Sequence, residues 1–325
     1  MSNQSSKAPA TRSPAVPFSL PSEFVKRPEA LAKVWGIDEA LQYTRWLATH
    51  HYENFHVVSF LLPKYLHQDF YNVYSYCRWA DDLADEIGNV AESLRLLDWW
   101  QRELDRMYEG QAQHPVFVAL RDTARKFNIP KQPFADLIRA FVQDQKTTRY
   151  QTWEEVLDYC VYSANPVGRL VLYLCGYSDP ERQRLSDATC TALQLANFWQ
   201  DVTVDQLKDR VYLPLDLLAK NNYTVEDLFA HRFDSRFEAV MREAVDQARK
   251  LFLTGLPLMR MVDRRLSIDL ELFSRGGMRI LDKIERQKYD VLSRRPSISK
   301  VERVSLLIGV VARAAFTRTP VARAA

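Results

Sequence analysis

The chain contains little glycine, with 9 Gly in 325 residues, and only 4 Cys, none in Cys-x-x-Cys spacing. Scarce glycine beside abundant Ala, Leu, Arg and Gln favours helices over strands joined by tight turns. The sequence has no Gly-rich phosphate loop and no Gly-x-Ser-x-Gly motif, which argues against P-loop nucleotide hydrolases and α/β-hydrolases. It also has no nucleic-acid-binding motif, so we expect no nucleic-acid partner.

Long apolar runs are absent as well. No stretch of 18 apolar residues occurs, so we expect no membrane span. The first 22 residues are rich in Ser, Pro and Ala without a continuous apolar segment, and we expect a disordered tail there, not a signal peptide. The cysteines are scattered through apolar helical patterns, which indicates core thiols in a reducing, cytoplasmic compartment. They are Cys77, Cys160, Cys175 and Cys190.

What the chain does have is a large apolar fraction at helical spacing. Hydrophobic residues make up 47% of it and aromatic residues 12%, enough for a substantial core. We find no strand-period alternation, internal repeat or linker. The pattern predicts one all-α domain of about a dozen helices at 23–298, followed by a basic helix and tail at 299–325. We expect helices at about 28–50, 67–86, 94–108, 116–128, 134–145, 153–160, 167–175, 180–208, 234–254 and 258–289.

One predicted helix carries an unusual cluster of charge. Tyr74, Arg78, Asp81, Asp82 and Asp85 fall on one of its faces. Like charges at i,i+4 destabilise a helix by a few tenths of a kcal/mol per pair, and burying them costs far more. We therefore expect a cation to complete this face.

The helix predicted after Pro180 carries a second polar cluster. Gln194, Asn197, Asp201 and Asp205 advance by 3, 4 and 4 positions, so they share one face of a continuous helix. Two carboxylates again stand at i,i+4, preceded by two amides, on a helix that is otherwise largely apolar. This cluster is the expected counterpart of the first.

Two such clusters predict a shared Mg²⁺ site, because Mg²⁺ binds few carboxylates and completes its shell with water and phosphate oxygens. Arg78 and Arg210 would then contact the phosphates. Two alternatives stay open. A single acidic pair is typical of a solvated helix face, and Arg78 could simply pair with its neighbouring aspartates. A di-iron site is poorly supported, because it needs two Glu-x-x-His motifs and only Glu53-Asn-Phe-His56 is present.

These motifs carry a family resemblance. Asp81-Asp82-Leu-Ala-Asp85 and Asn197-Phe-Trp-Gln-Asp201-Val-Thr-Val-Asp205 resemble the two aspartate-rich motifs of the squalene/phytoene synthase family. Asp209-Arg210-Val-Tyr212-Leu-Pro follows in the order typical of the family, and the similarity extends from about residue 52 to 295. The resemblance implies the all-α isoprenoid synthase fold, with the catalytic domain at 23–298 built around a central cavity.

Within the family, the chain is most similar to the hydroxysqualene synthases of bacterial hopanoid biosynthesis. Asn165-Pro166 stands where phytoene synthases usually have Ala-Gly, which argues against phytoene synthesis. The resemblance implies conversion of presqualene diphosphate and water to hydroxysqualene and diphosphate. The alternative is head-to-head condensation of two farnesyl diphosphates to presqualene diphosphate or squalene, and a non-catalytic helical scaffold is a distant third. The stretches that carry this similarity are Glu53-Asn54-Phe55, Gln143-Asp-Gln145, Thr148-Arg-Tyr150, Ser163-Ala-Asn165-Pro166-Val-Gly168-Arg169 and Leu195-Ala-Asn197-Phe-Trp-Gln200.

The resemblance also implies roles for individual residues. Gln194, Arg78, Arg210 and Tyr212 would support the bound diphosphate. Phe55 and Tyr74 are candidates for the wall that faces a carbocation, although aromatic residues on helices are core residues by default. As a hypothesis, Asn165 or a neighbouring polar group positions the captured water. The expected Mg²⁺ and diphosphate ligands are Asp81, Asp85, Asn197, Asp201 and Asp205.

The expected partner is a lipid diphosphate, and no obligate protein partner is evident. From residue 260 to the C-terminus the chain has 15 Lys and Arg against seven Asp and Glu, a local charge of +8. This basic C-terminal third and the helix expected at 304–316 could contact the anionic inner membrane peripherally. The alternative is that this helix packs on the domain with its arginines solvated.

Overall fold

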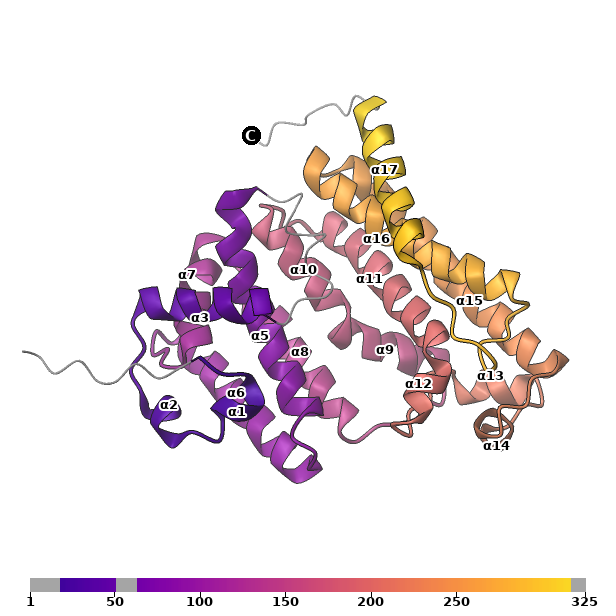
Figure 1. The fold of residues 1–325 in the computed structure, drawn as a ribbon, viewed down its shortest axis with the longest axis horizontal. Helices are drawn as coiled ribbons and strands as arrows, with labels where there is room; N and C mark the ends of the chain where they lie inside the picture. The colour runs from indigo at the N-terminus through magenta and orange to yellow at the C-terminus, as the bar shows by residue number, and fades with distance from the viewer. Residues whose placement is uncertain (1–17, 51–62, 317–325) are drawn as a thin grey trace, which may run out of the picture.

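The computed structural model describes residues 18–50 and 63–316, and it is built of helices (Figure 1). No strand occurs within these ranges, where the β-type pairing is an isolated bridge between Arg149 and Val211. The all-α prediction is therefore confirmed.

The first half of the chain includes α5, the helix that carries the first aspartate cluster. They are α1 (Pro21–Phe24), α2 (Pro28–Ala32), α3 (Ile37–His50), the 3-10 helix η1 (Lys64–Leu66), α5 (His67–Asp85), α6 (Val90–Tyr108), α7 (Pro115–Lys126) and α8 (Gln132–Asp144). The second half follows from α9. It comprises α9 (Trp153–Ser163), α10 (Asn165–Leu174), α11 (Pro180–Gln200), α12 (Val202–Gln206), α13 (Leu215–Lys220), α14 (Val225–Phe229), α15 (Ser235–Gly255), η2 (Leu256–Arg260), α16 (Arg264–Arg286) and α17 (Lys300–Phe316).

Two main hydrophobic cores hold these helices together. The first lies among α3 and α5 to α8, where the rings of Trp79 and Trp100 stack with centroids 5.0 Å apart. The Trp79 indole N–H donates to the Tyr43 hydroxyl at 3.0 Å. The second core lies among α9, α11 and the helices that follow. Figure 1 shows the two halves side by side, with α8 of the first half and α9 to α11 of the second half in the middle of the view.

Several predicted boundaries need correction. The helix expected at 28–50 is divided into α2 and α3, because Lys33 leaves α2 with extended backbone. The helix expected to reach about residue 208 ends at Gln200, and α12 starts at Val202. The helix expected at 258–289 is divided into η2 and α16. Residues 18–22, assigned above to the tail, are ordered: Phe18 packs on the first core and α1 starts at Pro21, so the predicted tail boundary is too late.

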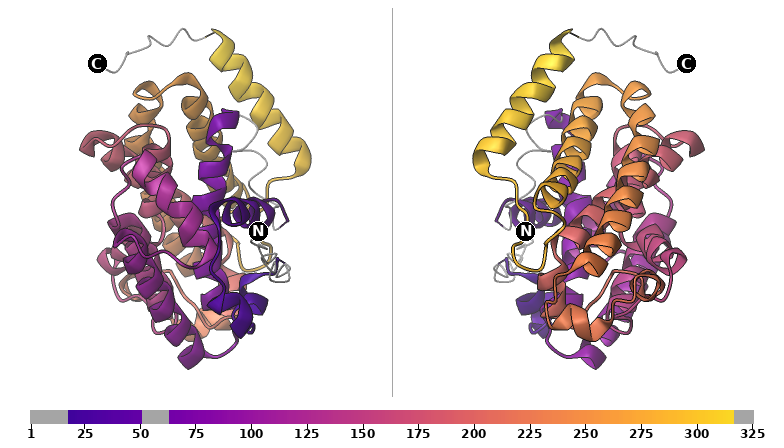
Figure 2. Two further views of the ribbon diagram at one scale, coloured as in Figure 1. Left: turned by 90° about the vertical axis from the view of Figure 1, so that its left-hand side faces the viewer. Right: turned by 90° about the vertical axis from the view of Figure 1, so that its right-hand side faces the viewer.

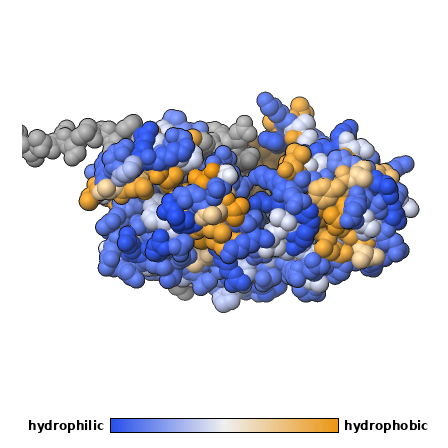
Figure 3. All heavy atoms as spheres, turned by 90° about the horizontal axis from the view of Figure 1, so that it is seen from below, coloured by the Kyte–Doolittle hydropathy of each residue, from blue (hydrophilic) through white to orange (hydrophobic). Residues whose placement is uncertain are grey.

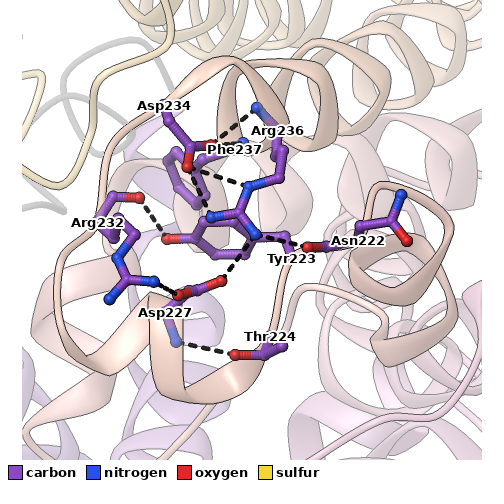
Figure 4. A network of polar contacts seen from close by, with 8 residues as sticks. All are labelled: Asn222, Tyr223, Thr224, Asp227, Arg232, Asp234, Arg236 and Phe237. Atoms are coloured by element: carbon purple, nitrogen blue, oxygen red, sulfur yellow. Dashed lines mark hydrogen bonds and ion pairs between the residues drawn. The ribbon is translucent and has the colours of Figure 1, made fainter.

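A polar network anchors α14 and the start of α15 (Figure 4). Thr224 caps α14 by accepting from the Asp227 backbone N–H at 3.1 Å. The Asp227 carboxylate pairs with Arg232 and with Arg236, the latter at 3.1 Å. The Tyr223 hydroxyl donates to the Arg232 carbonyl at 2.8 Å. The loop before α15 is thus fixed by side chains from both flanking helices.

The last helix, α17, packs along α16 (Figure 2). Lys283 of α16 pairs with Glu302 at 2.8 Å, and Arg313 of α17 pairs with Glu271 at 3.0 Å. In the part of the chain that the structure describes, no helix is both long and apolar enough to cross a membrane. The face shown in Figure 3 is mostly hydrophilic, with hydrophobic residues gathered in separate patches.

Candidate functional site

A cavity of about 230 Å³ lies where α5, α8, α9, α11 and the segment after α12 meet. Its lining combines carboxylates, amides and one arginine with an apolar and aromatic wall. The polar members are Asp81, Asp85, Asp144, Ser163, Gln194, Asn197, Asp205 and Arg210. The apolar and aromatic members are Leu137, Ala140, Phe141, Tyr159, Phe198 and Tyr212. Both predicted clusters therefore contribute side chains to one cavity.

On α5, the aspartates differ in their surroundings. Asp82 is buried and pairs with Arg78, and its burial raises the pKa of the carboxyl to about 6 although Arg78 opposes the shift. Asp81 lines the cavity, and its carboxylate lies 3.5 Å from the Arg78 guanidinium. Burial raises the pKa of Asp81, Arg78 lowers it and the neighbouring Asp85 raises it again. Arg78 does pair with its helix neighbours, as one alternative interpretation of the sequence had it.

Asp85 ends α5 and meets two cations from the segment after α12. Its carboxylate lies 2.8 Å from the Lys208 ammonium and 3.8 Å from the Arg210 guanidinium. Arg210 also donates to the Asp144 backbone carbonyl at 3.4 Å. The two basic residues thus tie the first aspartate helix to the second half of the chain.

The second cluster does not lie on one continuous helix. The helix breaks at Asp201, which ends α11 and precedes α12. Asp201 pairs with Arg295, whereas Asp205 on α12 lines the cavity. Burial raises the pKa of Asp205 to about 7, Asp201 adds to the rise, and Arg210 and Lys208 oppose it.

Hydrogen bonds to α14 and to the residues that follow it hold the short helix α12. Gln206, next to Asp205, donates to the Leu228 carbonyl at 3.0 Å. The Gln206 side-chain oxygen lies 2.9 Å from Nε2 of His231. A five-residue helix has little stability of its own, so these contacts fix the direction in which Asp205 points.

Asp144, at the end of α8, is a cavity residue that sequence reasoning missed. One of its carboxylate oxygens accepts from the Tyr159 hydroxyl at 3.0 Å. The other, Oδ1, is buried and has no hydrogen-bond partner among the described residues. Burial raises the pKa of Asp144 to about 6, with Arg210 opposing the shift. A signal was available, because a carboxylate in the last turn of a helix opposes the helix dipole.

The aromatic wall is centred on Tyr212. Its ring stacks on Phe198 with centroids 3.7 Å apart and an interplanar angle of 4°, and the rings of Tyr159 and Tyr150 flank it. Tyr74 is half-buried on α5 and outside the cavity lining, and burial raises the pKa of its hydroxyl.

Two further residues were predicted for the site. Phe55 is outside the described residues. Asn165 is buried at the start of α10, and its side-chain oxygen accepts from the Thr191 hydroxyl at 2.9 Å. It does not line the cavity, whereas Ser163, two residues earlier, does.

The donor set suits a hard divalent cation. Carboxylate and amide oxygens are the ligands that Mg²⁺ prefers, and one buried carboxylate oxygen in the cavity, Asp144 Oδ1, has no hydrogen-bond partner among the described residues. The described side chains nevertheless contain no group of three or more His, Cys, Asp or Glu already placed to hold an ion. The side chains of the cavity are of the types that bind Mg²⁺, but the described residues are not already arranged around an ion site.

Comparison with known proteins covers the part of the chain that holds both aspartate clusters. A family model described as squalene/phytoene synthase matches residues 48–302. The chain is 33% identical over 271 residues to the phytoene synthase of Thermus thermophilus, covering 83% of this chain and 92% of that protein. It is 31% identical over 273 residues to the phytoene synthase of Arthrospira platensis, covering 79% and 87%.

Solved structures extend the comparison. The crystal structure of squalene synthase HpnC from Alicyclobacillus acidocaldarius is 44% identical, with a TM-score of 0.75, and the match covers 77% of this chain and 94% of that one. A dehydrosqualene synthase in complex with ligand superposes with a TM-score of 0.76 at 23% identity, over 86% and 98% of the two chains. At 23% identity, the match to the dehydrosqualene synthase shows a shared fold.

Proposed function

The chain belongs to the squalene/phytoene synthase family, whose members act on prenyl diphosphates, and on this premise we propose that it converts presqualene diphosphate and water to hydroxysqualene and diphosphate. The supporting observation is the 44% identity to squalene synthase HpnC, against 28–33% to the phytoene synthases. Asn165-Pro166 supports the same choice, since phytoene synthases usually have Ala-Gly there. We infer a place in squalene and hopanoid biosynthesis.

The second candidate is head-to-head condensation of two farnesyl diphosphates to presqualene diphosphate or squalene. It is favoured by the name of the same relative, which is a squalene synthase. Both reactions start by releasing diphosphate from an isoprenoid, so both would use the same carboxylates and cations.

We assign Mg²⁺ binding to oxygen atoms from both halves of the chain. Bound Mg²⁺ would neutralise the diphosphate as it leaves. Arg78 and Arg210 would bind phosphate oxygens, and Gln194 would support them through its amide. In this proposal, Lys208 and Arg210 hold Asp85 in place before substrate binds. The ligands would be Asp81, Asp85, Asn197, Asp201 and Asp205.

The aromatic wall of the cavity would stabilise the carbocation. The stacked rings of Tyr212 and Phe198 present electron-rich faces, and a cation held near them gains about 0.5–2 kcal/mol. The apolar side chains beside them limit the access of water to the cation. Phe55 stays a candidate for this wall through the family resemblance, whereas Tyr74 lies outside the cavity lining.

We also propose that the enzyme works in the cytoplasm, in peripheral contact with the inner membrane that holds its lipid substrate and product. The four cysteines are unpaired, as expected of a reducing compartment. The outer face of α17 exposes Val301, Val304, Ile308 and Val311, with exposed fractions of 78%, 56%, 63% and 44%. Such an apolar stripe on a basic segment suits an anionic lipid surface.

The test is product identification. Purified protein is incubated with Mg²⁺ and either presqualene diphosphate or farnesyl diphosphate, and the lipid products are identified by mass spectrometry. We expect hydroxysqualene from presqualene diphosphate and no product from farnesyl diphosphate alone. Presqualene diphosphate formed from farnesyl diphosphate, or squalene formed once NADPH is added as the hydride donor, would favour the second candidate.

A further inference from the structure

Ser163, the last residue of α9, lines the cavity with a hydroxyl that is buried and has no hydrogen-bond partner in the described ranges. Oδ1 of Asp144, on α8, belongs to the same cavity and is likewise buried without a hydrogen-bond partner among the described residues. Buried polar atoms in folded proteins are nearly always paired, so two unpaired atoms in one cavity indicate a missing partner. The cavity volume of about 230 Å³ exceeds the roughly 30 Å³ that one water molecule occupies in the liquid.

These two atoms belong to a polar strip. Tyr159 and Ser163 are four residues apart on α9 and share a helix face. The Tyr159 hydroxyl donates to Asp144 Oδ2 at 3.0 Å, which leaves Asp144 Oδ1 free to accept. Apart from Asp144, the neighbouring lining from α8 is apolar, at Leu137 and Phe141. A water molecule entering this part of the cavity therefore finds polar partners in Ser163 of α9 and Asp144 at the end of α8.

Asn165 is not one of the polar partners available to this water molecule. Its side-chain oxygen already accepts from Thr191 between α10 and α11, and it does not line the cavity. Ser163 is thus the neighbouring polar group that faces the reaction space.

We propose that the Ser163 hydroxyl positions the water molecule that captures the carbocation, and so determines that the product is an alcohol. This inference rests on the proposed function. A lone pair of the water oxygen forms the new C–O bond at the cationic carbon, and the water loses one proton to the released diphosphate. The C–O bond to diphosphate has broken beforehand, so the net change is replacement of diphosphate by hydroxide.

A serine hydroxyl suits this task because it can both donate and accept. By accepting one water hydrogen while Asp144 Oδ1 accepts the other, it would turn the water lone pair towards the cation. Without the hydroxyl, the cation would be lost by proton elimination to a hydrocarbon.

The experiment compares Ser163→Ala, Ser163→Thr and the wild type with presqualene diphosphate and Mg²⁺. Two quantities are measured: total diphosphate release and the fraction of lipid product that is alcohol. For Ser163→Ala we expect an alcohol-to-hydrocarbon ratio about tenfold lower, the scale of one hydrogen bond, with diphosphate release largely retained. Ser163→Thr, which keeps the hydroxyl, should restore the ratio. Val161→Ala, on the exposed side of α9, is the matched control.

An unchanged alcohol fraction in Ser163→Ala, with wild-type diphosphate release, would overturn the role assigned to Ser163 and leave the proposed function standing. Wild-type protein that forms no alcohol from presqualene diphosphate would overturn the proposed function and this inference together. Should Ser163→Ala not fold, Ser163→Cys tests the same point, because a thiol is a weak donor of similar size.

Discussion

The Asp205 carboxylate provides the sharpest prediction, because the same charge should oppose folding and support activity. Asp205 lines the cavity, and burial with Asp201 nearby raises its pKa to about 7. A carboxyl whose pKa is raised by folding binds a proton more tightly in the native state. Between its unfolded pKa near 4 and about 7, the native protein therefore loses stability as the pH rises.

Asp205→Asn removes this loss. The shift from 3.8 to about 7 corresponds to about 4 kcal/mol at 1.36 kcal/mol per unit. Asp205 is only partly buried, and solvent screens its interactions. We therefore expect the free energy of unfolding of the variant to exceed that of the wild type by about 1–2 kcal/mol at pH 8. Near pH 4 the variant and the wild type should be equally stable, since the wild-type carboxyl is then protonated.

Urea unfolding at pH 4.5 and pH 8, in EDTA, measures the free energy of unfolding of both proteins. Asp209→Asn is the control: its side chain is 72% exposed and pairs with Arg149 at the surface, so its removal should change stability little at either pH. Turnover of Asp205→Asn with Mg²⁺ should fall by at least about 100-fold, as for the loss of an electrostatic group at a reacting centre. A variant less stable than the wild type at pH 8, or equally active, would refute the reasoning.

Three further predictions concern the site, the packing and the surface. Asp81→Ala should reduce turnover by about 100-fold or more without lowering the free energy of unfolding, because it removes a repelled charge; wild-type activity would support a solvated helix face. Gly168→Ala should lower the free energy of unfolding by about 1–3 kcal/mol, measured by thermal or urea unfolding, since a Cβ would lie 2.4 Å from Ser186 Oγ. Gly276→Ala, where a Cβ would meet nothing within 4 Å, should raise the free energy of unfolding by about 0.5–1 kcal/mol. The double variant Val304→Ser/Ile308→Ser should sediment less with anionic liposomes at unchanged stability, and equal sedimentation would exclude α17 as the contact.

Much of the fold follows from local signals in the sequence. Asp179 caps α11 by accepting from the Arg182 backbone N–H at 3.0 Å, as expected of an aspartate before Pro180. Thr152 likewise caps α9 by accepting from the Glu155 N–H at 3.3 Å, which confirms that predicted helix start. Caps and prolines act within a few residues, so the sequence alone reveals them.

The break at Asp201 was harder to predict, because the i,i+4 spacing of carboxylates continues across it. The β-branched run Val202-Thr-Val204 was the available signal, since such residues weaken helices. The two unpredicted pairings, Asp85 with Lys208 and Asp144 with Tyr159, join residues 123 and 15 positions apart. Contacts of this kind depend on how helices pack, which local periodicity does not encode.

In the proposed reaction, a carboxylate-lined cavity in this chain ionises a prenyl diphosphate and water captures the cation. The most direct measurement is incubation of the purified protein with presqualene diphosphate and Mg²⁺ in H₂¹⁸O, with mass spectrometry of the lipid. We predict hydroxysqualene carrying one ¹⁸O atom, formed with Mg²⁺ and not with EDTA. Unreacted presqualene diphosphate, or an alcohol without ¹⁸O, would contradict the account.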